Sequence, residues 1–222
     1  ATARPGDHIV LADGVYTGAA LSVAASGTAV QPIVIRAARK LGAELRFAVT
    51  LSGDHVTLWG CRFTGDHGKV ALTGNHDRVL RCEFSGWRFG HAIRFGQGGS
   101  HGQVRYCHIH DPGAWTADEL SGAAYGMRIN LRFVGGAASF HRNGRVSHCL
   151  FKDTLARPVS GDYGTGQTDW IEVGENGAAY PGVNAAAVIE DCLFDGHPDS
   201  NASGALDIKI SGVTVRRCTF KN

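Results

Sequence analysis

The stretch from Gly204 to Phe220, GALDIKISGVTVRRCTF, contains the pattern that decides the fold. Its second half places an apolar residue three positions before Cys218 and a phenylalanine two positions after it, as Val215-x-x-Cys218-x-Phe220. The same spacing, with phenylalanine or isoleucine in the last position, occurs at all six cysteines of the chain. The other five copies are Leu58/Cys61/Phe63, Val79/Cys82/Phe84, Val104/Cys107/Ile109, Val146/Cys149/Phe151 and Ile189/Cys192/Phe194.

Successive cysteines are 21, 25, 42, 43 and 26 residues apart. Periods of about 20 to 50 residues indicate a solenoid, a propeller or another repeat array. The short periods leave no room for a propeller blade, and the segments between glycine, asparagine and serine turns show no helical periodicity. We therefore predict an all-β, right-handed parallel β-helix, a single domain over residues 1–222, whose coils stack about 4.8 Å apart. The cysteines are expected to be buried free thiols.

The amino-acid composition limits the kinds of molecule that the chain is expected to bind. The 222 residues carry a formal net charge of +2, and 43% of them are hydrophobic, which suits one substantial core. No basic block is present to neutralise a phosphate backbone, so nucleic acid is not expected as a partner. No run of about 18 apolar residues occurs, so we expect no membrane span. The sequence starts without methionine and stops directly after a repeat copy, which we interpret as a β-helix cut at both ends.

The first half of the opening stretch, LDIKI at 206–210, alternates apolar and charged residues, which is typical of a strand with one buried face. Similar segments precede the other cysteines, and their outward residues are expected to stack into a polar row. Such a row would suit an extended polymer, and its arginines would either bind carboxylate or sulfate groups or serve as ordinary surface charges. The row comprises Ala71, Arg94, Arg128 or Asn130, Glu172 and Lys209, with Asp207 beside the last.

The segment PGDHIVLADGVYTG at 5–18 resembles the first-coil signature of several pectin-lyase-like β-helices, which is a signal of the fold. Three more specific motifs resemble polysaccharide lyase family 6, which includes chondroitinase B and alginate lyases. They are HDRVLRCEFSGW at 76–87, DWIEVG at 169–174, and LDIKIS at 206–211 followed by Thr219-Phe220. The resemblance implies that Lys209 is the general base that removes the C5 proton of a uronic acid in a β-elimination. It also implies that a metal or an arginine neutralises the uronate carboxylate.

The resemblance is incomplete around the implied metal. The two carboxylates with which the family holds calcium would fall at Ala202 and Gly204. Asp199 and Asp207 remain as the residues to consider for Ca²⁺. The catalytic arginine of the family would lie on the coil after Asn222, so the site in this sequence is incomplete or built differently.

Simpler interpretations compete for the same residues. In the simpler interpretation, Lys209 is a solvated lysine that pairs with Glu172 of the adjoining coil. A neighbouring carboxylate raises the pKa of a lysine, whereas a general base needs a lowered pKa. Trp115, in a long loop, would stack on a sugar ring or pack within the loop. His108 and His110 alternate along one strand and share a face, so they would serve a metal or simply line a turn.

The sequence thus predicts a secreted or periplasmic lyase that cleaves alginate or a chondroitin- or dermatan-type polymer. The alternative is a non-catalytic β-helix that binds polysaccharide or has a structural role, and a further one is a uronate C5-epimerase. An open coil end at Asn222 would expose strand edges, so we also expect association with a missing C-terminal half or another chain. The residues expected to bind the acidic polysaccharide are Arg94, Arg128, Asn130, Glu172 and Trp115.

Overall fold

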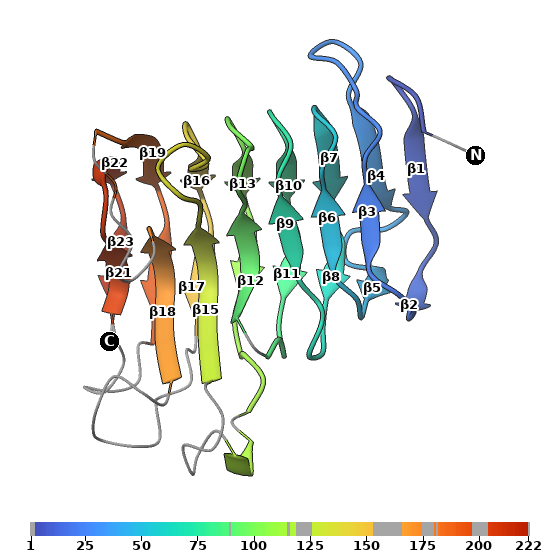
Figure 1. The fold of residues 1–222 in the computed structure, drawn as a ribbon. Coiled ribbons are helices and arrows are strands. Elements are labelled where there is room, and N and C mark those ends of the chain that lie inside the picture. Colours follow the sequence, from blue (N-terminus) through green and yellow to red (C-terminus); the bar gives the residue numbers. More distant parts are fainter. Residues whose placement is uncertain are drawn as a thin grey trace.

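A computed structural model of the chain describes residues 3–88, 90–114, 116–118, 126–152, 166–174, 180, 182–196 and 204–221. Its named elements are 23 β-strands in three parallel sheets. Figure 1 shows the strands stacked in chain order along one axis, with the N- and C-termini at opposite ends of the stack. Among these residues, no helix is long and apolar enough to cross a membrane. The parallel β-helix predicted from the sequence is confirmed.

Each of the first seven coils gives one strand to each sheet, because neighbours within a sheet are three strands apart in the chain, and the last coil gives β22 and β23 to the first and second sheets. The first and second sheets have eight strands each. The first sheet contains β1 (His8–Leu11), β4 (Ile33–Ala37), β7 (Val56–Trp59), β10 (Arg78–Leu80), β13 (Gln103–Arg105), β16 (Arg145–Ser147), β19 (Asn184–Glu190) and β22 (Ser211–Arg216). The second contains β2 (Gly14–Tyr16), β5 (Ala43–Leu45), β8 (Arg62–Phe63), β11 (Glu83–Phe84), β14 (His108–Ile109), β17 (Leu150–Lys152), β20 (Leu193–Asp195) and β23 (Thr219–Lys221).

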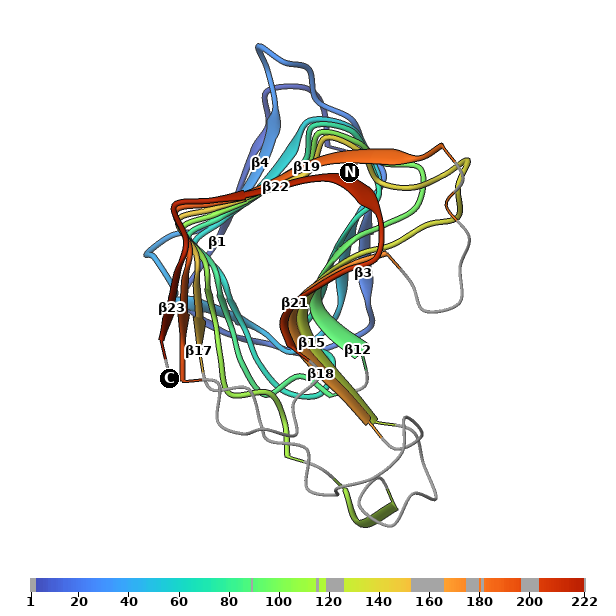
Figure 2. The ribbon, with the colours of Figure 1, turned by 90° about the vertical axis from the view of Figure 1, so that its left-hand side faces the viewer.

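The third sheet has seven strands and includes the longest strands among the described residues. Figure 2, which looks along the axis, shows the three sheets as the three sides of the coil. Side chains that point inward from all three sides form one core. The third sheet contains β3 (Leu21–Val23), β6 (Val49–Leu51), β9 (Val70–Leu72), β12 (Gly90–Phe95), β15 (Gly126–Phe133), β18 (Gly166–Val173) and β21 (Gly204–Ile208).

A single residue makes the turn between the first and second sheets, directly before each cysteine. All six of these residues have a φ between 53° and 67°, the left-handed region. Only one of the six is glycine, so the other five adopt a backbone conformation that costs roughly 1–2 kcal/mol each. Because this turn needs no loop, the number of residues from the apolar residue to the cysteine is the same in every copy. The six residues are Gly60, Arg81, Tyr106, His148, Asp191 and Arg217.

Stacked like side chains fill the interior behind this turn. The rings of Phe63 and Phe84 lie 4.8 Å apart at an angle of 6°, and those of Phe151 and Phe194 lie 4.9 Å apart at 11°. All six cysteines are free thiols and five of them are buried, as predicted. Burial raises the pKa of the Cys61 thiol to about 11, so this thiol is neutral and packs as a small apolar group.

Candidate functional site

The outer face of the third sheet carries polar side chains at matching positions on adjacent coils, which we call the third-sheet row. Strand pairing sets Arg94 of β12 opposite Ala71 and Arg132. It also sets Glu172 of β18 opposite Arg132 and Asp207. Since adjacent strands are about 4.8 Å apart, each side chain reaches its neighbour on the next coil. The row therefore places two arginines next to two carboxylates along the axis of the coil.

This row differs in strand register from the expected one. Arg132 takes the position beside Arg94 that the sequence analysis gave to Arg128 or Asn130. Residues 127–133 alternate apolar and polar side chains throughout, and a shift of two residues leaves such an alternation unchanged. The pattern therefore identified the strand and its outward face, but it left the partner of Arg94 open.

Arg128 and Asn130 are fully buried instead. The Nε atom of Arg128 donates to the carbonyl oxygen of Gly113 at 2.8 Å, and its Nη2 atom donates to that of Ala114 at 3.2 Å. The Nδ2 atom of Asn130 lies 3.5 Å from the carbonyl oxygen of Ile109. A buried polar group needs such partners, and here the partners are backbone carbonyls of β14 and of the segment that follows it. Both side chains thus hold backbone carbonyl groups through hydrogen bonds, and neither belongs to the third-sheet row.

Lys209 directly follows β21, and its amino group lies between two carboxylates. Its Nζ atom is 2.5 Å from Oε1 of Glu172 and 2.5 Å from Oδ2 of Asp207. Glu172 is fully buried and also pairs with Arg132, with 2.7 Å between Oε2 and Nε. Burial lowers the pKa of Lys209, but the hydrogen bonds and charges of Asp207 and Glu172 outweigh burial and raise it. The two carboxylates therefore favour the ammonium form of Lys209 at neutral pH.

A polar hollow of about 320 Å³ adjoins the row. Within the described part of the chain, the buried Nε atom of Arg94 and the buried Nδ1 atom of His91 have no hydrogen-bond partner. Burial, together with the positive charges of Arg94, Arg132 and Lys69, lowers the pKa of His91 to about 3, so its imidazole is neutral. The hollow thus offers unused donors and acceptors to a polar ligand. Its lining consists of Thr73, His91, Arg94, Gln97, Arg132 and Val134.

Sequence reasoning missed His91 and Arg132. His91 stands two positions before the buried Ile93, so regular strand alternation would place it inside the core and gives no signal for the hollow. Arg132 belongs to the same alternating segment as Arg128, so its outward direction was readable. Its coil partner was not, because the register depends on where the strand enters the sheet.

The described residues do not fit a calcium site. Ca²⁺ takes six to eight oxygen ligands. The carboxylates of Glu172 and Asp207 both bond to the Lys209 ammonium, so a positive group already occupies the position that the ion would take. Asp199, the other residue considered for calcium, and Trp115, considered for sugar stacking, lie outside the described residues.

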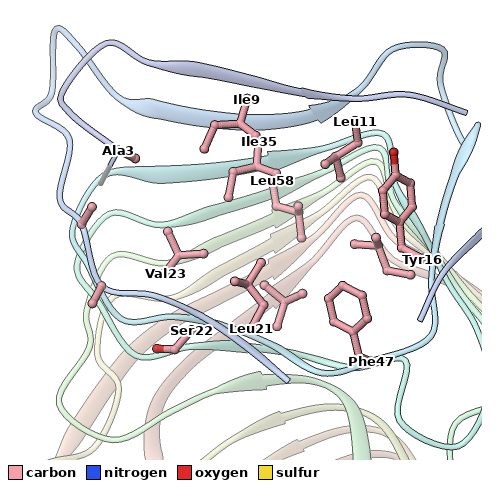
Figure 3. Close-up of a pocket in the computed structure, with 14 residues that line it drawn as sticks. Ala3, Ile9, Leu11, Tyr16, Leu21, Ser22, Val23, Ile35, Phe47 and Leu58 are labelled. Atoms are coloured by element: carbon pink, nitrogen blue, oxygen red, sulfur yellow. The ribbon is translucent and has the colours of Figure 1, made fainter. Parts of the chain in front are cut away.

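A larger hollow of about 510 Å³ lies at the β1 end of the coil. Figure 3 shows mainly apolar side chains facing it, among them Ile9, Val23 and Phe47. β1 is the edge strand of its sheet, so this hollow is the open end of the core. Its lining offers little polar chemistry, and we place the candidate site at the third-sheet row and its polar hollow.

Comparisons with known proteins agree with this fold. Residues 1–73, about a third of the chain, match the family model described as chondroitinase B. A search of curated protein sequences gives no match. A family 6 polysaccharide lyase from Pseudopedobacter saltans aligns with a TM-score of 0.64 and 16% identity over 96% of this chain and 49% of its own. A mannuronic acid specific family 6 lyase from human gut microbiota gives 0.62 and 17% over 98% and 49%.

A pectate lyase also aligns, with a TM-score of 0.59 and 16% identity over 93% of this chain and 60% of its own. At sequence identities this low, the structural likeness shows a shared parallel β-helix fold. The chain spans about half the length of the two family 6 structures. The family model thus supports the resemblance over residues 1–73, and the structural likeness confirms the parallel β-helix over nearly the whole chain.

Proposed function

We propose that this chain forms part of a polysaccharide lyase that acts on a uronic-acid polymer along the outer face of the third sheet. The observation that carries the proposal is the polar hollow, where the buried Nε atom of Arg94 lacks a partner among the described residues and Arg132 lies on the next coil. Guanidinium groups bind carboxylates through paired hydrogen bonds, and every uronic acid unit carries one carboxylate.

The comparisons support a choice of polymer. One structural neighbour is specific for mannuronic acid, which makes mannuronate-rich alginate the first substrate to test. The family model that matches residues 1–73 is that of chondroitinase B, which makes a chondroitin- or dermatan-type glycan the second. Both polymers lie outside the cytoplasm, and we accordingly propose a secreted or periplasmic location.

The reaction is a β-elimination. A base takes the proton from C5, the electron pair forms the C4–C5 double bond, and the bond from C4 to the glycosidic oxygen breaks as that oxygen gains a proton. Arg94 and Arg132 would hold the uronate carboxylate and stabilise the negative charge that develops on it. Lys209 would transfer the proton, on the strength of the resemblance of LDIKIS to the family motif.

The charge state of Lys209 sets a condition on this mechanism. An ammonium ion cannot accept the C5 proton, so Lys209 becomes a base only after passing its own proton to another group. The nearest acceptors are the carboxylates of Glu172 and Asp207, each 2.5 Å away. In its protonated form, Lys209 suits proton donation to the leaving oxygen. The same geometry supports the alternative of a non-catalytic β-helix that binds polysaccharide. An ammonium group held in place by two carboxylates attracts an anionic polymer even if no bond is cleaved.

One set of measurements separates the two functions. Polymannuronate, mixed alginate and dermatan sulfate are incubated with the protein, the unsaturated product is followed by its ultraviolet absorbance, and polymer binding is measured by calorimetry. We expect turnover, and we expect Lys209→Ala to reduce it by at least about 100-fold, the usual contribution of a proton-transfer group. Lys40→Ala, which removes an exposed lysine away from the row, is the matched control and should retain full activity.

The remaining outcomes are also decisive. Binding without turnover, weakened by Arg94→Ala, would establish the non-catalytic function. Full activity in Lys209→Ala would exclude this lysine as the proton-transfer group while leaving the lyase function intact. Neither binding nor turnover with any of the three polymers would refute the proposal.

A further inference from the structure

The outer face of the second sheet carries a separate cluster of metal-binding side chains. Glu83 of β11 is directly opposite His108 of β14 on the next coil, and His110 follows two positions later. The two imidazole rings stack with centroids 4.0 Å apart at an angle of 23°. One potential ligand atom from each of the three side chains lies within 4.8 Å of the others. In the part of the chain that the structure describes, no other group of three such residues meets this condition.

The hydrogen bonds of the cluster leave its ligand atoms unused. The Nε2 atoms of His108 and His110 are both buried and have no hydrogen-bond partner among the described residues. A buried polar atom without a partner is uncommon, and an ion or a water is one of the few ways to satisfy it. Two such atoms on adjacent rings therefore point to a shared ligand that accepts electron pairs.

A neighbouring carboxylate fixes the form of one imidazole. The Nδ1 atom of His110 lies 2.7 Å from Oδ2 of Asp111. A neutral imidazole that donates through Nδ1 keeps its lone pair on Nε2, which is the form that binds a metal. A carboxylate behind a ligating histidine is the usual outer-shell partner in zinc sites. The cluster thus has a carboxylate that orients a histidine, in addition to the three side chains that would bind the metal.

We propose that Glu83, His108 and His110 bind a divalent transition-metal ion of the Zn²⁺ type, with the fourth position open to solvent. Two imidazole nitrogens and one carboxylate oxygen suit Zn²⁺ or Cu²⁺, whereas Ca²⁺ and Mg²⁺ prefer oxygen ligands alone. The ion would join two adjacent coils of the second sheet. The site lies outside the third-sheet row and does not depend on the proposed lyase activity.

Two basic side chains face the cluster and limit its affinity. Arg62 of the preceding coil pairs with Glu83, with 2.9 Å between Nε and Oε1. Its side chain is 40% exposed, and an exposed ion pair of this kind is weak and rearranges easily. Lys152 lies on the following coil, near the histidines. One carboxylate oxygen of Glu83 can still bind the metal while the other keeps Arg62.

The first test measures Zn²⁺ binding by competition with a chromophoric chelator at pH 7.5, using the metal ion alone as the probe. We expect one Zn²⁺ per chain and an increase in the melting temperature. The double variant His108→Gln/His110→Gln should weaken binding by at least about 100-fold, and Asp111→Asn by roughly 10-fold because it acts through His110. His76→Gln/His101→Gln removes another stacked pair, with centroids 4.6 Å apart, and should leave binding unchanged.

The second test uses the unaltered chain, so it remains decisive if a variant fails to fold. Cu²⁺ is added at one equivalent, and its electron paramagnetic resonance spectrum is recorded. Two coordinated imidazole nitrogens are expected. A spectrum with fewer than two nitrogens would overturn the proposal. So would the absence of saturable Zn²⁺ binding, or an equal loss of affinity in the control pair.

Discussion

The second and third sheets belong to the same coils but differ in what sets their register. In the second sheet, six of the eight strands begin directly after a cysteine and have two or three residues each, so the phenylalanine or isoleucine in each of them is positioned by a fixed number of residues. In the third sheet, β15 and β18 have eight residues each. A repeat that includes its own turn determines the register, whereas an alternating strand determines only which face is buried.

The two sheets also differ in how they obtain stability. The second sheet stacks apolar side chains in the core, as Phe63 on Phe84. The outer face of the third sheet combines fully buried Glu172 with Arg132 and Lys209. Apolar stacking tolerates small errors of position. A buried charge does not, because it depends on close partners.

The largest expected effect comes from breaking the apolar ladder. Phe84 is fully buried between Phe63 and Ile109 of the adjoining coils. Phe84→Ala should lower the free energy of unfolding by about 3–5 kcal/mol, the usual loss for a buried phenylalanine. Phe220→Ala is the matched control, because Phe220 has the same repeat position but is 51% exposed. Urea unfolding of the three proteins measures the effect. Equal losses in both variants would show that the repeat position, and not burial, sets the contribution.

These contrasts explain how far the sequence could go. The six cysteine copies were enough to predict the coil and the buried thiols, because each copy contains its own turn. The sequence also predicted that a polar row lies on the outer face of the third sheet and that Arg94 and Glu172 belong to it. The position of Arg132 depends on the strand register, and the placement of His91 at the hollow departs from the regular alternation, so neither could be read from the sequence.

A second prediction concerns the buried charge of the third sheet. Glu172→Gln removes the carboxylate that Arg132 and Lys209 share, so it should lower the free energy of unfolding by about 3 kcal/mol. It should also lower the pKa of Lys209, because a negative charge that raises this pKa is lost. NMR titration of the lysine side-chain carbons measures the second effect.

Glu190 provides the control for this pair. It is a fully buried carboxylate on the first sheet that pairs with Arg145, Arg216 and Arg217, whose side chains are about half exposed. Glu190→Gln should cost less stability, because exposed partners regain water, and it should leave the pKa of Lys209 unchanged. An unchanged Lys209 pKa in Glu172→Gln would show that Asp207 alone holds the ammonium, and it would weaken the argument that the third-sheet row acts as one network.

The smallest expected effect tests a turn that leads into the first sheet. Asp77 is fully buried, and its Oδ1 atom accepts the backbone N–H of Val56 at 3.0 Å. Burial is the main cause that raises its pKa from 3.8 to about 7, and the charge of Asp54 adds to it. Because the folded-state pKa is the higher one, the ionised carboxylate opposes folding. This cost is absent below about pH 4, grows as the pH rises, and is complete above about pH 7.

Asp77→Asn keeps an acceptor oxygen for Val56 but carries no charge, so its stability should lack this pH dependence. Between pH 5 and pH 8, the unaltered chain should lose on the order of 2 kcal/mol relative to the variant. Urea unfolding at both pH values measures the difference. His141, whose pKa burial lowers to about 4, is present in both proteins and cancels in the comparison. Parallel stability curves would show that Asp77 titrates normally and that hydrogen bonds from the backbone, which lower its pKa, dominate at this turn.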